Sequence, residues 1–339
     1  MLKKQIKDLW QLCFNDSEAF TELYFTHRYN NDVNIYIQSG EEIISALQML
    51  PYQMTFCSSK IPTAYISGAC THPDYRGKGV MHELLSQAFA RMQSQGVLLS
   101  TLIPANDYLF DYYRKKGYAS IFNYTEENYL AKDTTFNVRG LRIETLSDFR
   151  EDVYHYLSHK MKERSCCIQH TAADLKVILA DLRLTNGSLV IALREKNICG
   201  VAFCYPDGET LRINELLADN AEIEKAVLAK AAKQWKCNKA TAIRPVKKGL
   251  EEHHLGMARI IDAKKVLQLF AAAFPQEEMN IELTDDTLAA NNGYYYINNG
   301  KCMKSDERVI GSTHQRLNIE MLALKIFAPL QPYMSLMLN

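Results

Sequence analysis

Residues 71–81 read Thr71-His72-Pro73-Asp74-Tyr75-Arg76-Gly77-Lys78-Gly79-Val80-Met81, and this stretch decides the fold. The residues before it, 64–70, have the apolar character of a buried strand, and those after it have the spacing of an amphipathic helix. The apolar face of that helix consists of Val80, Leu84, Leu85, Ala88, Phe89 and Met92. A strand, a short basic loop with glycines and a helix therefore follow one another directly.

This junction is typical of an anion-binding site. The first amides of a helix have no acceptor within the helix, and the helix dipole is positive at that end, so both favour a phosphate. Arg76 and Lys78 add fixed positive charge. The alternative is an ordinary strand-to-helix turn whose charged side chains are solvated.

The composition narrows the class of protein. A chain of 339 residues is too long for one ordinary core, so we expect two or three domains. Its net charge of zero favours neither a nucleic-acid partner nor a membrane surface, and no apolar run is long enough to span a bilayer. The nine cysteines lack paired CxxC spacing, and we expect residues 1–6 to start a polar helix rather than a signal peptide. We expect a cytoplasmic protein with reduced thiols.

The first third of the chain predicts helices, antiparallel strands and then a strand–helix–strand–helix unit. Helical spacing runs to Cys13, and Asn15-Asp16-Ser17 can cap a second helix that ends near Phe25. Alternating apolar residues on either side of Ser39-Gly40 predict a β-hairpin. Further elements are expected at 64–70 (strand), 80–95 (helix), 97–102 (strand) and 108–116 (helix).

The middle of the chain repeats this layout after a linker expected near 133–137. The expected helices are 148–161, 172–185 and 221–236, and the expected strands are 188–193, 198–205 and 210–217. The junction between the last strand and helix reads Ala218-Asp219-Asn220-Ala221-Glu222, which is acidic and has no glycine. It would repel a phosphate, so we expect the second copy to lack an anion site.

A third, smaller region begins near Gly256, after Glu251-Glu252-His253-His254, which we interpret as a solvated linker. It predicts helices at 263–273 and 319–327, a strand at 279–284 and a hairpin across Asn298-Asn299-Gly300. The chain's last residues, 332–339, are mostly apolar. Because burial of apolar surface is favourable, we expect this end to be docked.

A second motif strengthens the interpretation of the anion loop. Asn106 is followed seven residues later by Tyr113, in Asn106-Asp107-Tyr108-Leu109-Phe110-Asp111-Tyr112-Tyr113-Arg114-Lys115-Lys116-Gly117-Tyr118. Together with Arg76-Gly77-Lys78-Gly79, this resembles the GCN5-related N-acetyltransferase (GNAT) superfamily, whose loop is Arg/Gln-x-x-Gly-x-Gly/Ala and whose later helix carries Asn…Tyr-x-x-x-Gly-Phe/Tyr. The order and spacing match over about residues 1–125.

Met81 stands where that loop pattern has its last Gly or Ala, and this resembles the enhanced intracellular survival (Eis) type of acetyltransferase. The resemblance implies an α+β chain of tandem acyl-CoA N-acyltransferase (GNAT) folds, with mixed central sheets flanked by helices, and a small α+β domain like sterol carrier protein. The implied domains are 1–136, which binds acetyl-CoA, 137–255, a degenerate GNAT fold, and 256–339, the sterol-carrier-like domain. The chain length and the acidic second loop fit this layout.

The resemblance also implies a site. Acetyl-CoA would be the co-substrate, with no metal, and its pyrophosphate would sit on the loop while its pantetheine arm lies along the preceding strand. The implied cofactor residues are Ala69, Cys70, Thr71, Arg76, Gly77, Lys78, Gly79, Val80, Met81 and Asn106. Tyr113 corresponds to the superfamily's general acid, and the C-terminal carboxylate, here that of Asn339, to the general base of the Eis type.

Each of these residues also has a structural interpretation. Tyr113 could be a core tyrosine, Asn106 could satisfy backbone groups at a strand bulge, and Asn339 could be a docked terminus without chemistry. Cys70 could be a nucleophile that forms an acetyl-enzyme, although a small buried strand residue is the favoured interpretation. His155 and His159 are four apart on a helix, but no third metal ligand is evident, so surface or core histidines are favoured.

The predicted activity is direct transfer of an acetyl group from acetyl-CoA to an amine. The resemblance implies a small-molecule acceptor, with aminoglycoside-like polyamines as the prototype, and a homo-oligomer, a hexamer. Two alternatives belong to other classes: a non-catalytic acyl-CoA-responsive binding protein, and a lipid-binding protein that uses residues 256–339. The sequence gives neither the natural acceptor nor the acyl-chain preference.

Overall fold

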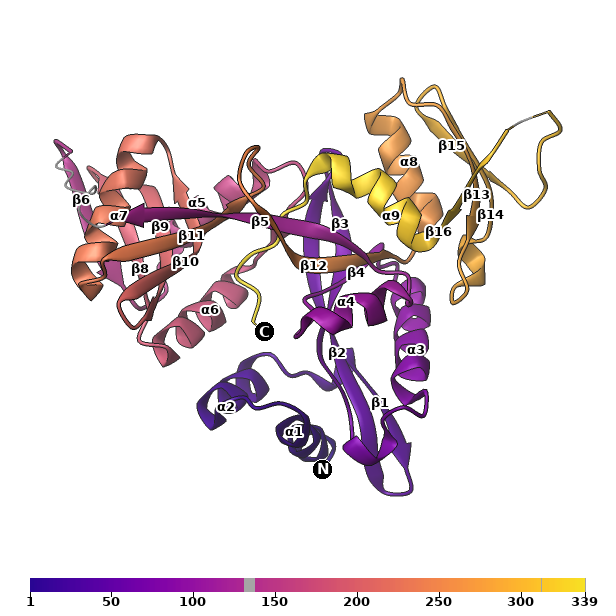
Figure 1. Cartoon of the computed structure of the whole chain (residues 1–339), viewed down its shortest axis with the longest axis horizontal. Coiled ribbons are helices and arrows are strands. Elements are labelled where there is room, and N and C mark those ends of the chain that lie inside the picture. The colour runs from indigo at the N-terminus through magenta and orange to yellow at the C-terminus, as the bar shows by residue number, and fades with distance from the viewer. Residues whose placement is uncertain (131–137, 312, 339) are drawn as a thin grey trace. The chain divides into compact units, whose positions relative to one another are not determined.

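A computed structural model describes residues 1–130, 138–311 and 313–338 (Figure 1). Two compact units emerge from its contacts: unit 1 comprises Met1–Phe122 and His254–Pro332, and unit 2 comprises Asn123–His253 and Tyr333–Leu338. Each unit is described by itself. Strands β5 and β12 cross the boundaries at 122 and 254, so both units contain part of each. The three-domain division at 136 and 255 remains a prediction, and the linker expected near 133–137 lies outside the described residues.

Unit 1 contains a mixed sheet with helices packed on it. Its elements are α1 (Leu2–Cys13), α2 (Glu18–His27), β1 (Asn34–Ser39), β2 (Glu42–Phe56), β3 (Ser59–Thr71), α3 (Val80–Ser94), β4 (Leu99–Leu102), α4 (Asp107–Arg114), β5 (Ala119–Leu130) and β12 (Glu252–Ile260). β1, β2 and β3 form an antiparallel meander, β4 runs parallel to β3, and β12 pairs antiparallel with β4. The predicted capping of the second helix is confirmed, because the Ser17 hydroxyl accepts a hydrogen bond from the Phe20 amide at 3.2 Å.

The core of this sheet forms as its helix pattern predicts. The face of α3 that carries Leu84, Leu85, Ala88, Phe89 and Met92 is buried against β1, β2 and β3. A separate apolar cluster holds α1 and α2 and includes Trp10, Tyr24 and Phe25. Together these contacts fix the junction between β3 and α3.

The remainder of unit 1 is a smaller sheet with two helices. Its strands lie in the order β15 (Lys301–Ser305), β14 (Gly293–Asn298), β13 (Met279–Thr284) and β16 (Gln315–Asn318), and α8 (Ala263–Ala273) and α9 (Ile319–Phe327) pack on them. The expected helices at 263–273 and 319–327 are confirmed. The side chains of Arg259 of β12 and Asp285 after β13, each 1 % exposed, form a 2.6 Å ion pair between the two parts of unit 1.

Unit 2 repeats the order of antiparallel strands followed by a parallel crossover. Its elements are the C-terminal part of β5, β6 (Leu141–Leu146), α5 (Glu151–Lys162), β7 (Ile168–Gln169), α6 (Ala172–Leu184), β8 (Ser188–Arg194), β9 (Asn197–Asp207), β10 (Thr210–Ala218), α7 (Ala221–Trp235) and β11 (Lys239–Pro245). β8, β9 and β10 form an antiparallel meander, and β11 returns parallel to β10 after α7. The predicted class, mixed sheets flanked by helices, is therefore confirmed.

One sequence interpretation is wrong. Residues 252–254 are the first residues of β12 rather than part of a solvated linker. The other end of the strand is stabilised by backbone pairing with β4, from Met257–Leu102 to Ile260–Leu99. β4 lies about 150 residues earlier in the chain. The polar start of the strand gave no local signal of that partner.

Candidate functional site

β3 and β4 separate beside the predicted anion loop. They pair in parallel over three positions, the last being Tyr65 with Thr101. β3 then continues to Thr71 and pairs only on its β2 side within the described part of the chain. The other edge of residues 66–71, which includes Ala69, Cys70 and Thr71, therefore has no strand partner there. Such an edge offers backbone hydrogen bonds to an extended ligand.

A one-residue irregularity in β3 lies at this point. The register with β2 shifts between the Ala46–Cys70 and Gln48–Ser67 pairs, and Gly68 adopts a φ of +61°. A left-handed conformation in a strand is typical of a bulge and favours glycine. The bulge gives the free edge a bend between residues 67 and 70.

The loop between β3 and α3 has the conformation that its glycines suggest. Gly77 and Gly79 have φ values of +74° and +81°, and Gly79 is the N-cap of α3. Arg76 and Lys78 are exposed; the Arg76 Nε donates to the Thr71 carbonyl at 3.1 Å, and the Lys78 Nζ lies 5.1 Å from the centre of the Tyr75 ring. The two cationic side chains thus flank the start of the helix.

The first turn of α3 leaves its amides open. Gly79 has no side chain with which to cap the helix, and the amides of residues 80–82 have no acceptor among the described residues. Met81, which departs from the loop pattern, is half-buried and packs against the core. A phosphate group can therefore approach the helix dipole and these donors together.

The corresponding junction in unit 2 is closed to an anion. The Asn220 side chain caps α7 by accepting a hydrogen bond from the Ile223 amide at 3.0 Å. The Asp219 carboxylate accepts bonds from the Tyr156 hydroxyl and the Lys160 ammonium, each at 3.0 Å. A helix that carries its own cap and acidic residues in its first turn has neither the free donors nor the potential that a phosphate needs.

Tyr113 lies at the end of α4 and is 8 % exposed. Its ring makes edge contacts with the rings of Tyr112 and Tyr118, whose centres are 5.3 and 5.6 Å away. Burial, and to a lesser degree the neighbouring tyrosines, raise the pKa of Tyr113. Tyr113 belongs to the same apolar core cluster as Ile66 of β3 and Leu102 of β4, which directly follow the last β3–β4 pair. The phenol is therefore protonated at neutral pH, and its residue packs in the core beside the point where the strands separate.

Asn106 is the N-cap residue of α4, and its side chain is exposed and makes no capping bond. Only its carbonyl takes part locally, accepting a hydrogen bond from the Leu109 amide at 3.0 Å. The alternative role at a strand bulge is wrong, because the residue lies between β4 and α4 rather than in a strand. The Asn106 side-chain amide therefore takes no part in capping α4.

The proposed base, Asn339, lies outside the described residues. The expected docking of the chain's end is confirmed for residues 333–336, which are buried in unit 2. The Tyr333 amide donates a hydrogen bond to the Cys166 carbonyl at 2.8 Å, and the Tyr333 carbonyl accepts one from the Ile168 amide at 3.1 Å. The Ser335 hydroxyl donates to the buried Glu215 carboxylate at 2.6 Å, and the His170 Nε2 lies 2.9 Å from the Ser335 carbonyl oxygen.

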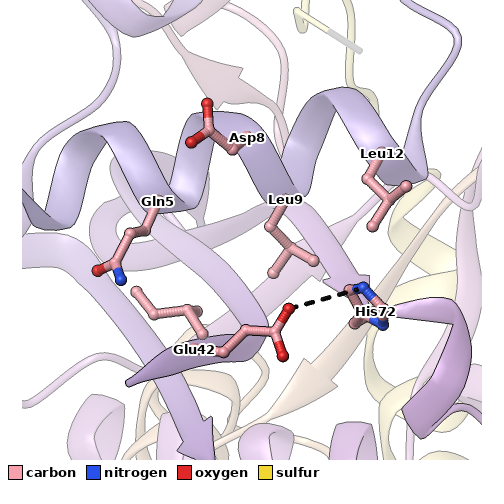
Figure 2. Close-up of a pocket in the computed structure, with 7 residues that line it drawn as sticks. Gln5, Asp8, Leu9, Leu12, Glu42 and His72 are labelled. Carbon is pink, nitrogen blue, oxygen red and sulfur yellow. Dashed lines mark ion pairs between the residues drawn. The ribbon is translucent and has the colours of Figure 1, made fainter.

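Two cavities in unit 1 were not predicted from the sequence. One, of about 220 Å³, lies between α1, the start of β2 and the residue after β3. Figure 2 shows Leu9 and Leu12 of α1 on the side of the helix that faces Glu42 and His72. The other, of about 290 Å³, is lined by the 114–117 segment, Arg259 and the segments 284–287 and 318–320. Both join residues more than 30 positions apart, a juxtaposition that local sequence patterns do not reveal.

Within the described ranges, no helix is long and apolar enough to cross a membrane. No cluster of three or more His, Cys, Asp or Glu side chains suited to a metal ion occurs there either. His155 and His159 of α5 are exposed; His155 lies 3.5 Å from Glu151 of the same helix, and His159 lies 3.5 Å from Glu163, which directly follows it.

Comparison with known proteins agrees with this geometry. Residues 3–121 match the family described as "Acetyltransferase (GNAT) domain". No curated protein matches the chain. These 119 residues contain the split strands, the open helix start and Tyr113, so they form an acetyltransferase domain, and the chain is an acetyltransferase enzyme.

Solved structures share the fold over nearly the whole chain. A GCN5-related N-acetyltransferase from Anabaena variabilis ATCC 29413 is 18 % identical, with 98 % of this chain and 96 % of that chain covered and a TM-score of 0.78. A GCN5-related N-acetyltransferase from Kribbella flavida is 17 % identical, with coverages of 99 % and 95 % and a TM-score of 0.77. Eis1 from Mycobacterium abscessus is 12 % identical, with coverages of 96 % and 87 % and a TM-score of 0.74. At these identities the likeness shows the fold.

Proposed function

We propose that this acetyltransferase moves an acetyl group from acetyl-CoA directly to the amine of a small-molecule acceptor. The observation that carries the proposal is the uncapped first turn of α3 next to the unpaired edge of β3. In the chain, only one short turn, Pro73–Tyr75, stands between the two elements. An extended chain that ends in a pyrophosphate fits this pair of features, and the pantetheine and pyrophosphate of acetyl-CoA have that form.

The cofactor would bind in two parts. Its pyrophosphate accepts hydrogen bonds from the amides between Arg76 and Met81, with Lys78 adding charge. Its pantetheine arm lies along Ala69, Cys70 and Thr71, as an added strand does. The exposed Asn106 side chain, at the start of α4, is available for a further polar contact.

Tyr113 is proposed as the general acid. The acceptor nitrogen attacks the thioester carbonyl carbon, the carbon–sulfur bond breaks, and the leaving CoA thiolate takes the phenolic proton. A tyrosine with a raised pKa is protonated at neutral pH, so it has a proton to donate to the sulfur as the carbon–sulfur bond breaks. Its place in one core cluster with Ile66 and Leu102 supports this role, because these residues directly follow the last β3–β4 pair.

The acceptor amine must lose a proton in the same reaction. We propose, from the resemblance to the Eis type, that the C-terminal carboxylate of Asn339 is the general base. A terminal carboxylate with a pKa of about 3.5 is ionised at neutral pH and can orient an ammonium group or act through water. The buried 333–336 segment that precedes it supports this proposal.

The wider organisation follows the same resemblance. We propose that 1–136 is the catalytic domain, 137–255 a degenerate second GNAT fold and 256–339 a domain like sterol carrier protein, in a cytoplasmic homohexamer that acts on aminoglycoside-like or other polyamines. The self-capped start of α7 supports the degenerate second copy. The four-stranded sheet with α8 and α9 supports a distinct third fold.

The test is a CoA-release assay with acetyl-CoA and a panel of amines: aminoglycosides, spermidine, lysine peptides and arylamines. We expect turnover with at least one amine and a loss of kcat of about 100-fold or more in Tyr113→Phe, with an unchanged acetyl-CoA dissociation constant. Tyr112→Phe is the matched control, because it removes a half-buried hydroxyl from the neighbouring residue.

The other results have definite meanings. Equal loss in both variants would remove Tyr113 from the chemistry. Binding of acetyl-CoA without turnover of any amine would favour an acyl-CoA-responsive role, and failure to bind it would refute the cofactor site at α3. Undiminished turnover after deletion of Leu338 and Asn339 would remove the terminal carboxylate from the mechanism.

A further inference from the structure

The end of helix α4, which carries Tyr113, borders the cavity of about 290 Å³ in unit 1. The segment 114–117 forms one wall of this cavity, and the segments 284–287 and 318–320 line it from elsewhere in the unit. Packing alone therefore does not fix that side of the turn. Tyr113 is the penultimate residue of α4, so the position of its phenol depends on what holds the turn.

A buried arginine from a distant strand binds this turn. Arg259 of β12 is 1 % exposed, and its Nη1 donates a hydrogen bond to the Lys116 carbonyl at 3.0 Å. Its guanidinium carbon lies 4.7 Å from the centre of the Phe89 ring, on the buried face of α3. The guanidinium group is thus packed on the core and bonded to the residue that precedes the turn glycine.

Gly117 makes room for this contact. It has a φ of +81°, and a Cβ built on it would lie 1.8 Å from the Arg259 Nη1. Gly96 follows α3 with the same pattern of backbone hydrogen bonds and a φ of +75°, yet no atom among the described residues lies within 4 Å of its hypothetical Cβ. The glycine of the second motif therefore accommodates the arginine as well as the turn.

A fixed carboxylate orients the arginine. The Arg259 Nη2 donates to the Asp285 carboxylate at 2.6 Å. The same carboxylate accepts hydrogen bonds from the amides of Thr287 and Leu288 at 3.0 and 3.1 Å, and from the Asn291 side chain at 2.9 Å. Because these bonds use both carboxylate oxygens, the turn at 285–291 sets the direction of the guanidinium group.

The backbone transmits this contact to Tyr113. The amides of Lys116 and Tyr118, on either side of Gly117, both donate to the Tyr113 carbonyl, at 2.8 and 3.1 Å. Arg259 therefore holds Lys116, and Lys116 in turn holds Tyr113. A displacement of the arginine would move the last turn of α4 and the phenol that it carries.

We propose that Arg259 is a positioning residue for the acetyl transfer, which fixes the end of α4 and thereby aims the Tyr113 phenol at the leaving sulfur. The inference rests on the proposed function, because it assigns Arg259 to the proposed general acid. The hydrogen bonds that the Arg259 side chain donates within the described residues go to Lys116 and Asp285. The arginine thus acts through the backbone of 113–117 rather than on the substrates.

The test is a double-mutant cycle of Arg259→Lys and Tyr113→Phe in the full chain, with the best amine of the CoA-release panel. Lysine keeps the charge beside Asp285 but lacks the planar fork that reaches two acceptors. We expect at least about tenfold lower kcat in Arg259→Lys, with an unchanged acetyl-CoA dissociation constant. In the Tyr113→Phe background the same substitution should cause no further loss, because both changes disable one group.

Hydrogen exchange gives a second measurement that does not require turnover. In Arg259→Lys, we expect the amides of Lys116 and Tyr118 to exchange at least about tenfold faster than in the wild type. Arg91→Lys is the matched control for both measurements. Arg91 also donates to a backbone carbonyl, that of Asn34 at 3.2 Å, but at the start of β1 rather than at α4. We expect it to leave kcat and the two amides as in the wild type.

Asp285→Asn carries the same cycle if Arg259→Lys does not fold. It keeps the arginine and nearly the same side-chain shape, and removes the charge that orients the guanidinium group. We expect a smaller loss of kcat that is likewise absent in the Tyr113→Phe background.

A wild-type kcat in folded Arg259→Lys, with a loss in Tyr113→Phe, overturns the positioning role alone. A loss that adds in full to that of Tyr113→Phe also overturns it, since the arginine would then act elsewhere. Unchanged exchange of the Lys116 and Tyr118 amides has the same meaning. A wild-type kcat in Tyr113→Phe refutes the proposed general acid itself, and this role of Arg259 with it.

Discussion

Trp10 occupies the space in which Gly68 would carry a side chain: a Cβ built on Gly68 would lie 2.0 Å from Cζ3 of the indole. Trp10 is 6 % exposed and its Nε1 donates to the Asp16 carboxylate at 2.8 Å, so core packing and this hydrogen bond both hold the indole in place. Gly68 also has a φ of +61°. The bulge in β3 therefore depends on a glycine for two reasons, its backbone conformation and its contact with α1.

Gly68→Ala is predicted to destabilise unit 1 by about 2–4 kcal/mol, because overpacking adds to the cost of a left-handed alanine. Gly40→Ala is the matched control. Gly40 also has a φ of +61°, but no atom lies within 4 Å of its hypothetical Cβ among the described residues. We expect it to cost about 1 kcal/mol. Denaturant unfolding of the two variants measures the difference in unfolding free energy. Equal losses would show that the Trp10 side chain moves to make room for the added methyl group.

The sequence was sufficient to predict elements but not the contacts between distant ones. The helix expected at 263–273 is α8, and the caps of α2 and the turn at Gly79 follow from residue types alone. The strands β11 and β12 were not predicted, and each pairs with a strand more than 100 residues away, β11 with β5 and β12 with β4. A single sequence carries no signal for such pairing when a strand begins with polar residues.

The candidate site divides in the same way. The loop at Arg76–Met81 and Tyr113 were identified because their spacing is a local pattern. Arg259 was not, since its partners Lys116 and Asp285 are 143 and 26 residues away and nothing in β12 points to them. Long-range polar contacts are decided by packing rather than by local propensity.

The tail of unit 2 is held by a buried carboxylate whose replacement should be costly. Glu215 is 1 % exposed, accepts two hydrogen bonds from the Arg164 guanidinium at 3.0 and 2.9 Å, and accepts a third from Ser335. Glu215→Ala is predicted to destabilise unit 2 by about 3–5 kcal/mol, because it leaves a mostly buried cation without this partner. Denaturant unfolding followed by the fluorescence of Trp235, which lies in the same unit, measures it.

Glu163→Ala is the control for that variant. Its exposed carboxylate lies 3.7 Å from the Lys160 ammonium, a surface pair worth at most about 1 kcal/mol. A loss in Glu215→Ala no larger than in this control would mean that the tail is not held by the buried carboxylate. Ser335→Ala should fall between the two, near the value of one hydrogen bond to a charged group, about 1.5–3 kcal/mol.

Buried tyrosines predict a loss of stability in alkali. Burial is the largest cause of the raised pKa values of four phenols in unit 1, those of Tyr24, Tyr65, Tyr113 and Tyr118. The folded state holds these protons more tightly than the unfolded state. Their stabilising effect is therefore complete below the unfolded pKa of about 10 and declines above it, by up to about 1.4 kcal/mol per pH unit for each phenol.

Unfolding free energies at a series of pH values up to about 11.5 test this expectation. Tyr113→Phe should make the alkaline decline shallower, since it removes one of the buried phenols. Tyr108→Phe, at a residue that is 71 % exposed, should leave the decline as in the wild type. Parallel curves for all three proteins would show that the Tyr113 phenol does not titrate with unfolding.

A single charge at the N-cap of α3 should decide between the anion site and an ordinary turn. Gly79 has open space around its hypothetical Cβ and a φ of +81°, which Asn and Asp tolerate better than other residues. Gly79→Asp places a carboxylate where we propose the pyrophosphate, whereas Gly79→Asn has nearly the same shape and no charge. Repulsion across about 4 Å predicts at least tenfold weaker acetyl-CoA binding for the Asp variant than for the Asn variant, with similar thermal stability. Isothermal titration calorimetry at low and high salt measures both, and the gap should narrow as salt screens the charge. Equal affinities at low salt would place the phosphate somewhere other than on α3.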